Sequence, residues 1–268
     1  MNRRDALRTL GMASAGVVLA PGQLRAQRVP IEVAGRPVEV AVASVSPSTV
    51  RLSVLPLDNS MARPVRNEGA LVAASAGREL ARQREVFSPV RAGNLRVRLA
   101  ADPTTLVVET ANGISIQRFR IDEKTSRIAF SPGKGPLLGF GEGGPQFDRK
   151  GSTYTNRNGQ AGYQLRTHGG RVPIQWLVST DGWGLYIHRP LGAFDLTGPE
   201  GLLTPASDAL PLDVFVTASA DPKEILREYA RITGFAELPP LWSFGYMQSH
   251  RTLAGPGEIN WVARSFRE

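Results

Sequence analysis

Two stretches of the chain combine aromatic side chains with planar polar groups. They are residues 151–160 and residues 242–251. Aromatic faces pack against the apolar C–H surface of a sugar ring, and amide or guanidinium groups hydrogen-bond its hydroxyls. The alternatives are a solvated loop for the first stretch and, for the second, a buried strand whose end is polar. Barrel enzymes keep their sites at the carboxyl ends of barrel strands, which favours a binding site in the second stretch.

The other motifs that could carry chemistry are weak. Residues 139–144 match G-x-G-x-x-G, but residues 145–151 do not form the helix that a dinucleotide site requires, so we predict a glycine-rich turn from strand to loop. There is no cysteine, and His168, His188 and His250 lack metal-ligand spacing. His188 ends a predicted strand and is expected to be a structural hydrogen-bonder. No carboxylate pair follows from spacing, and we predict no metal or cofactor.

The charge of the chain is basic but scattered. The formal net charge is +8 over 268 residues, with no block of five to eight Lys or Arg residues and no basic stripe interleaved with aromatic side chains. Nucleic-acid binding needs clustered charge, so we predict no nucleic-acid partner.

The amino terminus is typical of an export signal. Arg3 and Arg4 precede an apolar run at residues 12–20, which Pro21 ends, and we predict a signal peptide over residues 1–26. The arginine pair resembles a twin-arginine signal, so we expect a periplasmic or secreted protein. The apolar run is too short to span a bilayer, so no stable membrane insertion is expected. The alternative is a cytosolic amphipathic helix.

The elements that must position these residues are mostly strands. Period-two alternation recurs from about residue 30 to 218, and Asn112-Gly113 between two alternating runs predicts a hairpin. A second hairpin is predicted for residues 171–187 around a turn at 180–182. Short strands at regular spacing favour a β-sandwich over residues 27–219. Residues 69–80 fit either a short helix or an extended loop.

The pattern changes after the predicted sandwich. Residues 221–234 predict a helix with Asp221 as N-cap and Gly234 after its end, and Pro239-Pro240 closes a connecting segment of residues 220–240. Residues 242–247 are apolar without periodicity, which predicts a strand buried on both faces. Residues 258–268 have helical spacing. One such strand–helix unit cannot bury both faces of its strand.

The stretch from residue 139 to 251 resembles glycoside hydrolase family 31, the α-glucosidase and α-xylosidase family. The residues that carry the likeness are 138–142 with Phe147, the run 155–158, residues 183–186 and the run 239–249. The resemblance implies a mainly β fold: a galactose-mutarotase-like β-sandwich, then the first βα unit of an incomplete (β/α)8 barrel at residues 241–268.

The resemblance also implies an activity. Members hydrolyse glycosidic bonds with retention through two Asp residues on later barrel strands, about 5 Å apart. No catalytic residue is then expected in this chain, which by itself would be inactive. The substrate-binding candidates are Arg157, Asn158, Gln248 and His250. The first two would touch sugar hydroxyls, and the other two would line the floor of the pocket or the layer behind it.

The identity of the sugar stays open between an α-glucoside and an α-xyloside oligosaccharide. Members of the α-glucosidase type tend to carry Asp after the arginine, where this chain has Asn158. Two alternatives to the enzyme remain. One is a secreted carbohydrate-binding β-sandwich without catalysis, and the other is a sandwich that only braces a barrel.

Overall fold

The structure is a computed structural model that describes residues 29–66, 68–100, 103–142, 146–156, 172–189, 191–245 and 253–268. The predicted signal peptide lies outside these residues. The chain divides into two compact units, Met1–Thr233 and Gly234–Glu268. None of the described helices is long and apolar enough to cross a membrane.

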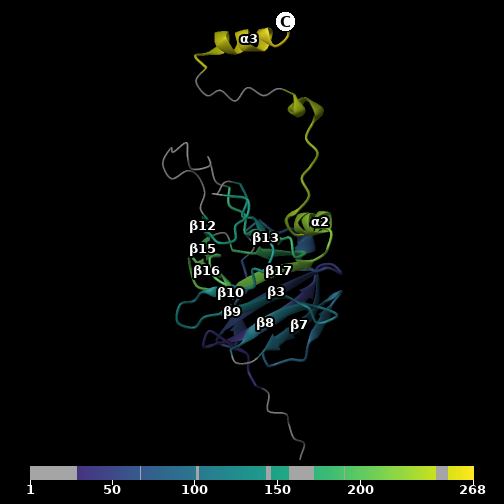
Figure 1. Ribbon diagram of the computed structural model, residues 1–268, viewed down its shortest axis with the longest axis vertical. Helices are drawn as coiled ribbons and strands as arrows, with labels where there is room; N and C mark the ends of the chain where they lie inside the picture. The colour runs from purple at the N-terminus through teal and green to yellow at the C-terminus, as the bar shows by residue number, and fades with distance from the viewer. Residues whose placement is uncertain are drawn as a thin grey trace, which may run out of the picture. The chain divides into compact units, whose positions relative to one another are not determined.

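The first unit is built from two antiparallel sheets (Figure 1). In the first sheet the described strands run in the order β1, β2, β3, β17, β14, β13, β11, with β4 paired to β3 and β5 to β2. Their bounds are β1 Glu32–Val33, β2 Arg36–Ser44, β3 Thr49–Asp58, β4 Met61–Ala62, β5 Arg78–Gln83, β11 Leu137–Gly139, β13 Trp176–Ser179, β14 Trp183–Ile187 and β17 Leu212–Ala218.

The second sheet has the described order β12, β15, β16, β10, β9, β8, β7, β6. The bounds are β6 Val90–Ala92, β7 Leu95–Ala100, β8 Thr105–Thr110, β9 Ser115–Ile121, β10 Ile128–Phe130, β12 Thr153–Asn156, β15 Gly192–Asp195 and β16 Gly201–Pro205. Figure 1 shows β7, β8 and β9 side by side in this sheet.

The core lies between the two sheets. Leu212, Val214 and Val216 of β17 point into it from the first sheet, and Val97 and Phe119 meet them from the second in one buried cluster. Successive side chains of a strand point to opposite faces, so the alternation in the sequence separates core from outer face. The predicted mainly β fold of two packed sheets is confirmed.

Both predicted hairpins are present. Strands β8 and β9 pair antiparallel around Gly113, whose φ of +83° is in the left-handed region that glycine tolerates. Strands β13 and β14 pair around the turn at residues 180–182, although β13 begins only at Trp176. Residues 69–80, for which either a short helix or an extended loop was predicted, contain a short 3-10 helix, η1 Ala73–Ala76. This helix leads into strand β5.

Helix α2, Pro222–Thr233, confirms the helix predicted for residues 221–234. The carboxylate of Asp221 accepts the backbone N–H of Lys223 at 2.9 Å as an N-cap, and Gly234 follows the helix with a φ of +99°. Ile225 and Ile232 pack with Phe215 in a second buried cluster. Because Phe215 alternates with the core residues of β17, this cluster covers the outer face of the first sheet.

Glu228 fixes α2 to that sheet, and its removal is a test of the docking. It is 1% exposed and accepts hydrogen bonds from the Thr49 hydroxyl at 2.7 Å and from Arg231 Nε at 3.0 Å. We expect Glu228→Ala to lower the free energy of unfolding by about 2 kcal/mol, because the buried Thr49 hydroxyl and the exposed Arg231 guanidinium both lose their acceptor. The control Glu224→Ala removes a partly exposed ion pair and should cost less than about 1 kcal/mol. Equal losses in urea unfolding would contradict this role.

The second unit contains a 3-10 helix, η2 Leu241–Phe244, and an α-helix, α3 Pro256–Ser265. The helix predicted for residues 258–268 is confirmed, shifted by two or three residues at each end. The buried strand predicted for residues 242–247 is wrong for the described residues up to Gly245, since Trp242 is 78% exposed within η2. A flat apolar run becomes a buried strand only where neighbouring strands supply hydrogen bonds, and no described strand pairs with it.

Candidate functional site

The four substrate-binding candidates lie outside the described residues. They are Arg157, Asn158, Gln248 and His250. Their roles and their proximity to one another therefore stay predictions. What the structure describes is the strand that leads directly into the first pair, β12, which ends at Asn156.

Strand β12 is anchored by a stack of aromatic rings. The rings of Phe140 and Tyr154 lie parallel with centroids 4.8 Å apart, and the Tyr154 hydroxyl donates to the backbone carbonyl of Phe140 at 3.1 Å. Phe194 of the paired strand β15 packs against Phe140 at 4.4 Å. The guanidinium of Arg149 lies 5.3 Å above the Tyr154 ring. The chain therefore enters residue 157 from a rigid base.

The glycine-rich motif forms the turn that makes this stack possible. Gly139 and Gly141 have φ values of +121° and +75°, and a Cβ at Gly139 would overlap the backbone oxygen of Trp176. Arg149 Nε donates to the carbonyl of Gly139 at 3.0 Å. No helix begins in the described residues that follow, 146–156. The prediction of a turn from strand to loop is confirmed for these residues.

Asn156, the residue before Arg157, is a candidate that was not among the predicted substrate-binding residues. Its side chain is 3% exposed, and neither its amide nitrogen nor its amide oxygen has a hydrogen-bond partner in the described structure. A buried polar group without a partner costs about 1–3 kcal/mol. Such groups are uncommon in folded proteins and mark positions where a partner is expected. The signal in the sequence was an amide at an alternating, inward position of a strand.

Three buried carboxylates, Glu39, Glu109 and Asp213, are unsuited to acid catalysis. Burial by itself raises the pKa of Glu39 and of Glu109, but hydrogen bonds from two arginines outweigh it in each case, and each pKa is lowered. Burial likewise opposes the lowered pKa of Asp213, where hydrogen bonds from His188 and Arg51 prevail. A glycosidase acid needs a raised pKa. Among the described residues, no group of three or more His, Asp and Glu could hold a metal ion.

Asp213 is the centre of a buried polar network on the outer face of the first sheet. It accepts hydrogen bonds from Arg51 Nε and Nη2 at 2.9 and 2.8 Å, from the Ser53 hydroxyl at 2.7 Å and from His188 Nδ1 at 3.1 Å. The prediction that His188 is a structural hydrogen-bonder is confirmed. The sequence signal for this network was an acidic residue within an apolar strand. Because side chains alternate along a strand, Asp213 lies on the opposite face of the sheet from Leu212.

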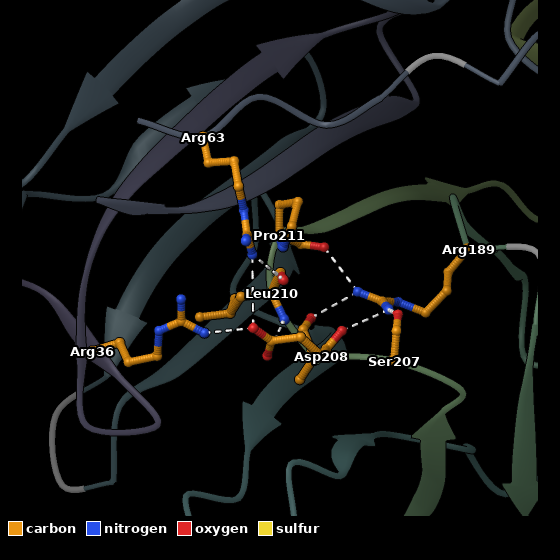
Figure 2. A network of polar contacts seen from close by, with 8 residues as sticks. Arg36, Arg63, Arg189, Ser207, Asp208, Leu210 and Pro211 are labelled. Atoms are coloured by element: carbon orange, nitrogen blue, oxygen red, sulfur yellow. Dashed lines mark hydrogen bonds and ion pairs between the residues drawn. The ribbon is translucent and has the colours of Figure 1, made fainter. Parts of the chain in front are cut away.

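A second polar network beside it fixes the loop of residues 206–211 (Figure 2). Arg189 donates to the Ser207 hydroxyl at 3.2 Å and to the backbone carbonyls of Asp208, Ala209 and Pro211 at 2.7, 3.0 and 2.9 Å. Burial lowers the pKa of Arg189. Arg36 pairs with the Asp208 carboxylate at 2.6 Å. Because these partners are distant in sequence, spacing did not indicate the network.

Comparisons with known proteins find glycoside hydrolases over part of the chain. No family model matches. The chain is 37% identical over 57 residues to alpha-glucosidase 2 of Bacillus thermoamyloliquefaciens, which is 21% of this chain and 7% of that protein. It is 30% identical over 98 residues to an alpha-xylosidase of Saccharolobus solfataricus, which is 36% of this chain and 13% of that protein. The matched segments thus span a small share of these relatives.

Among solved structures, the glucose complex of a GH31 dextranase from Flavobacterium johnsoniae matches with a TM-score of 0.68 at 16% identity. The match covers 86% of this chain and 30% of the dextranase. At this identity the likeness concerns the fold. The two-sheet unit has the fold of the amino-terminal domains of such glycosidases.

Proposed function

We propose that this chain is the amino-terminal portion of an exported, retaining α-glycosidase that acts on α-glucoside or α-xyloside oligosaccharides. The observation that carries the proposal is the match of 86% of the chain to part of a GH31 dextranase, together with the shorter matches to an α-glucosidase and an α-xylosidase. In this proposal residues 241–268 begin a (β/α)8 barrel, whose first strand forms only where later barrel strands pair with it. The sandwich braces that barrel.

The sandwich also lends a loop to the substrate pocket. Arg157 and Asn158 contact sugar hydroxyls, and Gln248 and His250 form the pocket floor or the layer behind it. The rigid base at Phe140 and Tyr154 supports this role, because a loop that orients a sugar gains from a fixed point of departure. The unpaired amide of Asn156, immediately before Arg157, adds a polar group to the same place.

The hydrolytic step requires two carboxylates, one of them with a raised pKa. Every described carboxyl group with a resolved shift has a lowered pKa, which is unsuited to the acid of the pair, and the resemblance to family 31 implies that both Asp residues belong to later barrel strands. We therefore expect residues 1–268 alone to release no p-nitrophenol from p-nitrophenyl α-xyloside or α-glucoside above the rate without protein.

Sequencing the coding region after the Glu268 codon tests the proposal directly. An open frame that encodes further barrel strands, two of them ending in Asp, is the expected result. Hydrolysis by residues 1–268 would refute the assignment of the catalytic pair to later strands. A stop codon at this position would favour the second candidate function, a carbohydrate-binding sandwich without catalysis.

Export is tested separately. We expect that replacing Arg3 and Arg4 by Lys leaves precursor in the cytoplasm, because a twin-arginine signal depends on the arginine pair. Unimpaired export of the double variant would contradict this route.

A further inference from the structure

A polar groove lies beside His188 on the first unit. It consists of two hollows of about 740 and 240 Å³ that share Glu68, His188 and Leu191 among their lining residues. The larger also has Arg66 in its lining, and the smaller has Gln175. Ligand sites typically measure about 300–1,000 Å³. We propose that this groove binds a neutral pyranose sugar through these four polar side chains.

The imidazole of His188 is held in one orientation. Its Nδ1 lies 3.1 Å from the Asp213 carboxylate, which only accepts hydrogen bonds, so the proton of the neutral ring belongs on Nδ1. The opposite nitrogen, Nε2, then presents a lone pair. No described group hydrogen-bonds to it, and His188 is among the lining residues of both hollows. A sugar hydroxyl is the kind of donor that this nitrogen can accept.

Three further side chains that line the groove have hydrogen-bonding groups that the rest of the described structure does not use. Arg66, Glu68 and Gln175 make no side-chain hydrogen bond or ion pair with any described residue. Arg66 and Glu68 line the larger hollow, and Glu68 and Gln175 line the smaller, so these side chains are available to a ligand in the groove. In contrast, the Arg36 guanidinium is paired with the Asp208 carboxylate, and the Arg189 guanidinium donates hydrogen bonds to the 206–211 loop (Figure 2).

The chemistry of the available groups matches a neutral sugar. Arg66 donates, Glu68 accepts, and the Gln175 amide does both, while the charges of Arg66 and Glu68 balance. An anion would meet Glu68 as well as Arg66, and a cation would meet Arg66 as well as Glu68, so neither gains a net attraction from this pair. Leu191, which is half exposed, adds an apolar surface for the C–H face of a ring. A neutral ring with several hydroxyls uses all of these groups.

Two walls of the groove, at His188 and at residues 206–211, are held by hydrogen bonds within the protein. Arg189 ties the 206–211 loop to the end of β14 through four hydrogen bonds, and Asp213 fixes His188 to β3 through Arg51 and Ser53. Binding therefore has to order Arg66, Glu68 and Gln175 but not these two walls. This site goes beyond the proposed glycosidase function, since it needs neither a barrel nor a catalytic pair.

The test is calorimetric titration of the full chain with D-glucose, D-xylose and D-glucuronate. We expect saturable binding of glucose or xylose. Glu68→Gln and Arg66→Met should each weaken it at least about tenfold, because each removes a charge-assisted hydrogen bond. Their matched controls are Glu237→Gln and Arg78→Met, which change exposed side chains outside the groove and should leave the affinity unchanged.

Three outcomes would overturn the proposal. The first is the absence of saturable binding by either neutral sugar. The second is unchanged affinity in both groove variants, which would place any site elsewhere. The third is binding of glucuronate alone, which would mean an anion site. Circular dichroism of each variant checks its fold. Hydrolysis assays test the proposed function and have no bearing on this groove.

Discussion

Replacement of Asp213 by Asn is expected to lower the free energy of unfolding of the first unit by about 3 kcal/mol. Breaking a buried ion pair by removing one partner costs roughly 3–5 kcal/mol, and the lower end applies because Arg51 keeps some access to water. The amide of Asn also donates toward Arg51, which adds to the loss. The measurement is urea unfolding followed by circular dichroism. The control is Asp58→Asn on the same strand as Arg51, an exposed position where the change should stay within about 0.5 kcal/mol.

The effect of Asp213→Asn depends on pH in a defined direction. The pKa of Asp213 in the folded protein lies below its ordinary value of 3.8, so the stabilisation is present above that value and is lost as the pH falls through the folded pKa. The gap in stability between the unmodified protein and the variant should therefore be full at pH 7 and shrink below pH 3.8. A gap that stays constant on acidification would contradict the role assigned to this carboxylate.

Replacement of Gly139 by Ala is expected to cost about 3 kcal/mol or more. A φ of +121° is strained for any residue with a Cβ, and the added carbon would overlap the backbone oxygen of Trp176, which cannot turn aside as a side chain does. The measurement is the midpoint of urea unfolding. Because Phe140 stacks on Tyr154, the displacement should extend to β12, the strand that precedes the predicted sugar-binding loop.

The control for Gly139 is Gly151→Ala. Gly151 also has a positive φ, +74°, but no atom lies within 4 Å of the position that its Cβ would occupy. Only the left-handed conformation is then penalised, at about 1 kcal/mol. A similar loss in both variants would show that backbone strain alone, without the close approach to Trp176, explains the need for glycine at 139.

Local signals account for the part of the fold that the sequence predicted. The hairpin at Gly113 and the cap at Asp221 depend on residues within a few positions of one another, so both could be predicted from the local sequence. The exposure of Trp242 was predicted wrongly for the opposite reason. Whether an apolar run is buried is decided by what packs against it, and that partner is not written in the run itself.

The order of residues alone indicated the alternation of the strands, the helices, the glycine turn and the resemblance that names Arg157, Asn158, Gln248 and His250 as candidates. The surroundings of His188 and Arg189 depend on the folded arrangement of the strands. Asp213 meets Arg51 across 162 residues and Arg63 meets the Leu210 carbonyl across 147, because neighbouring strands of one sheet come from distant parts of the chain. Convergence of this kind follows from strand order, so the groove beside His188 becomes visible only after the sheets have formed.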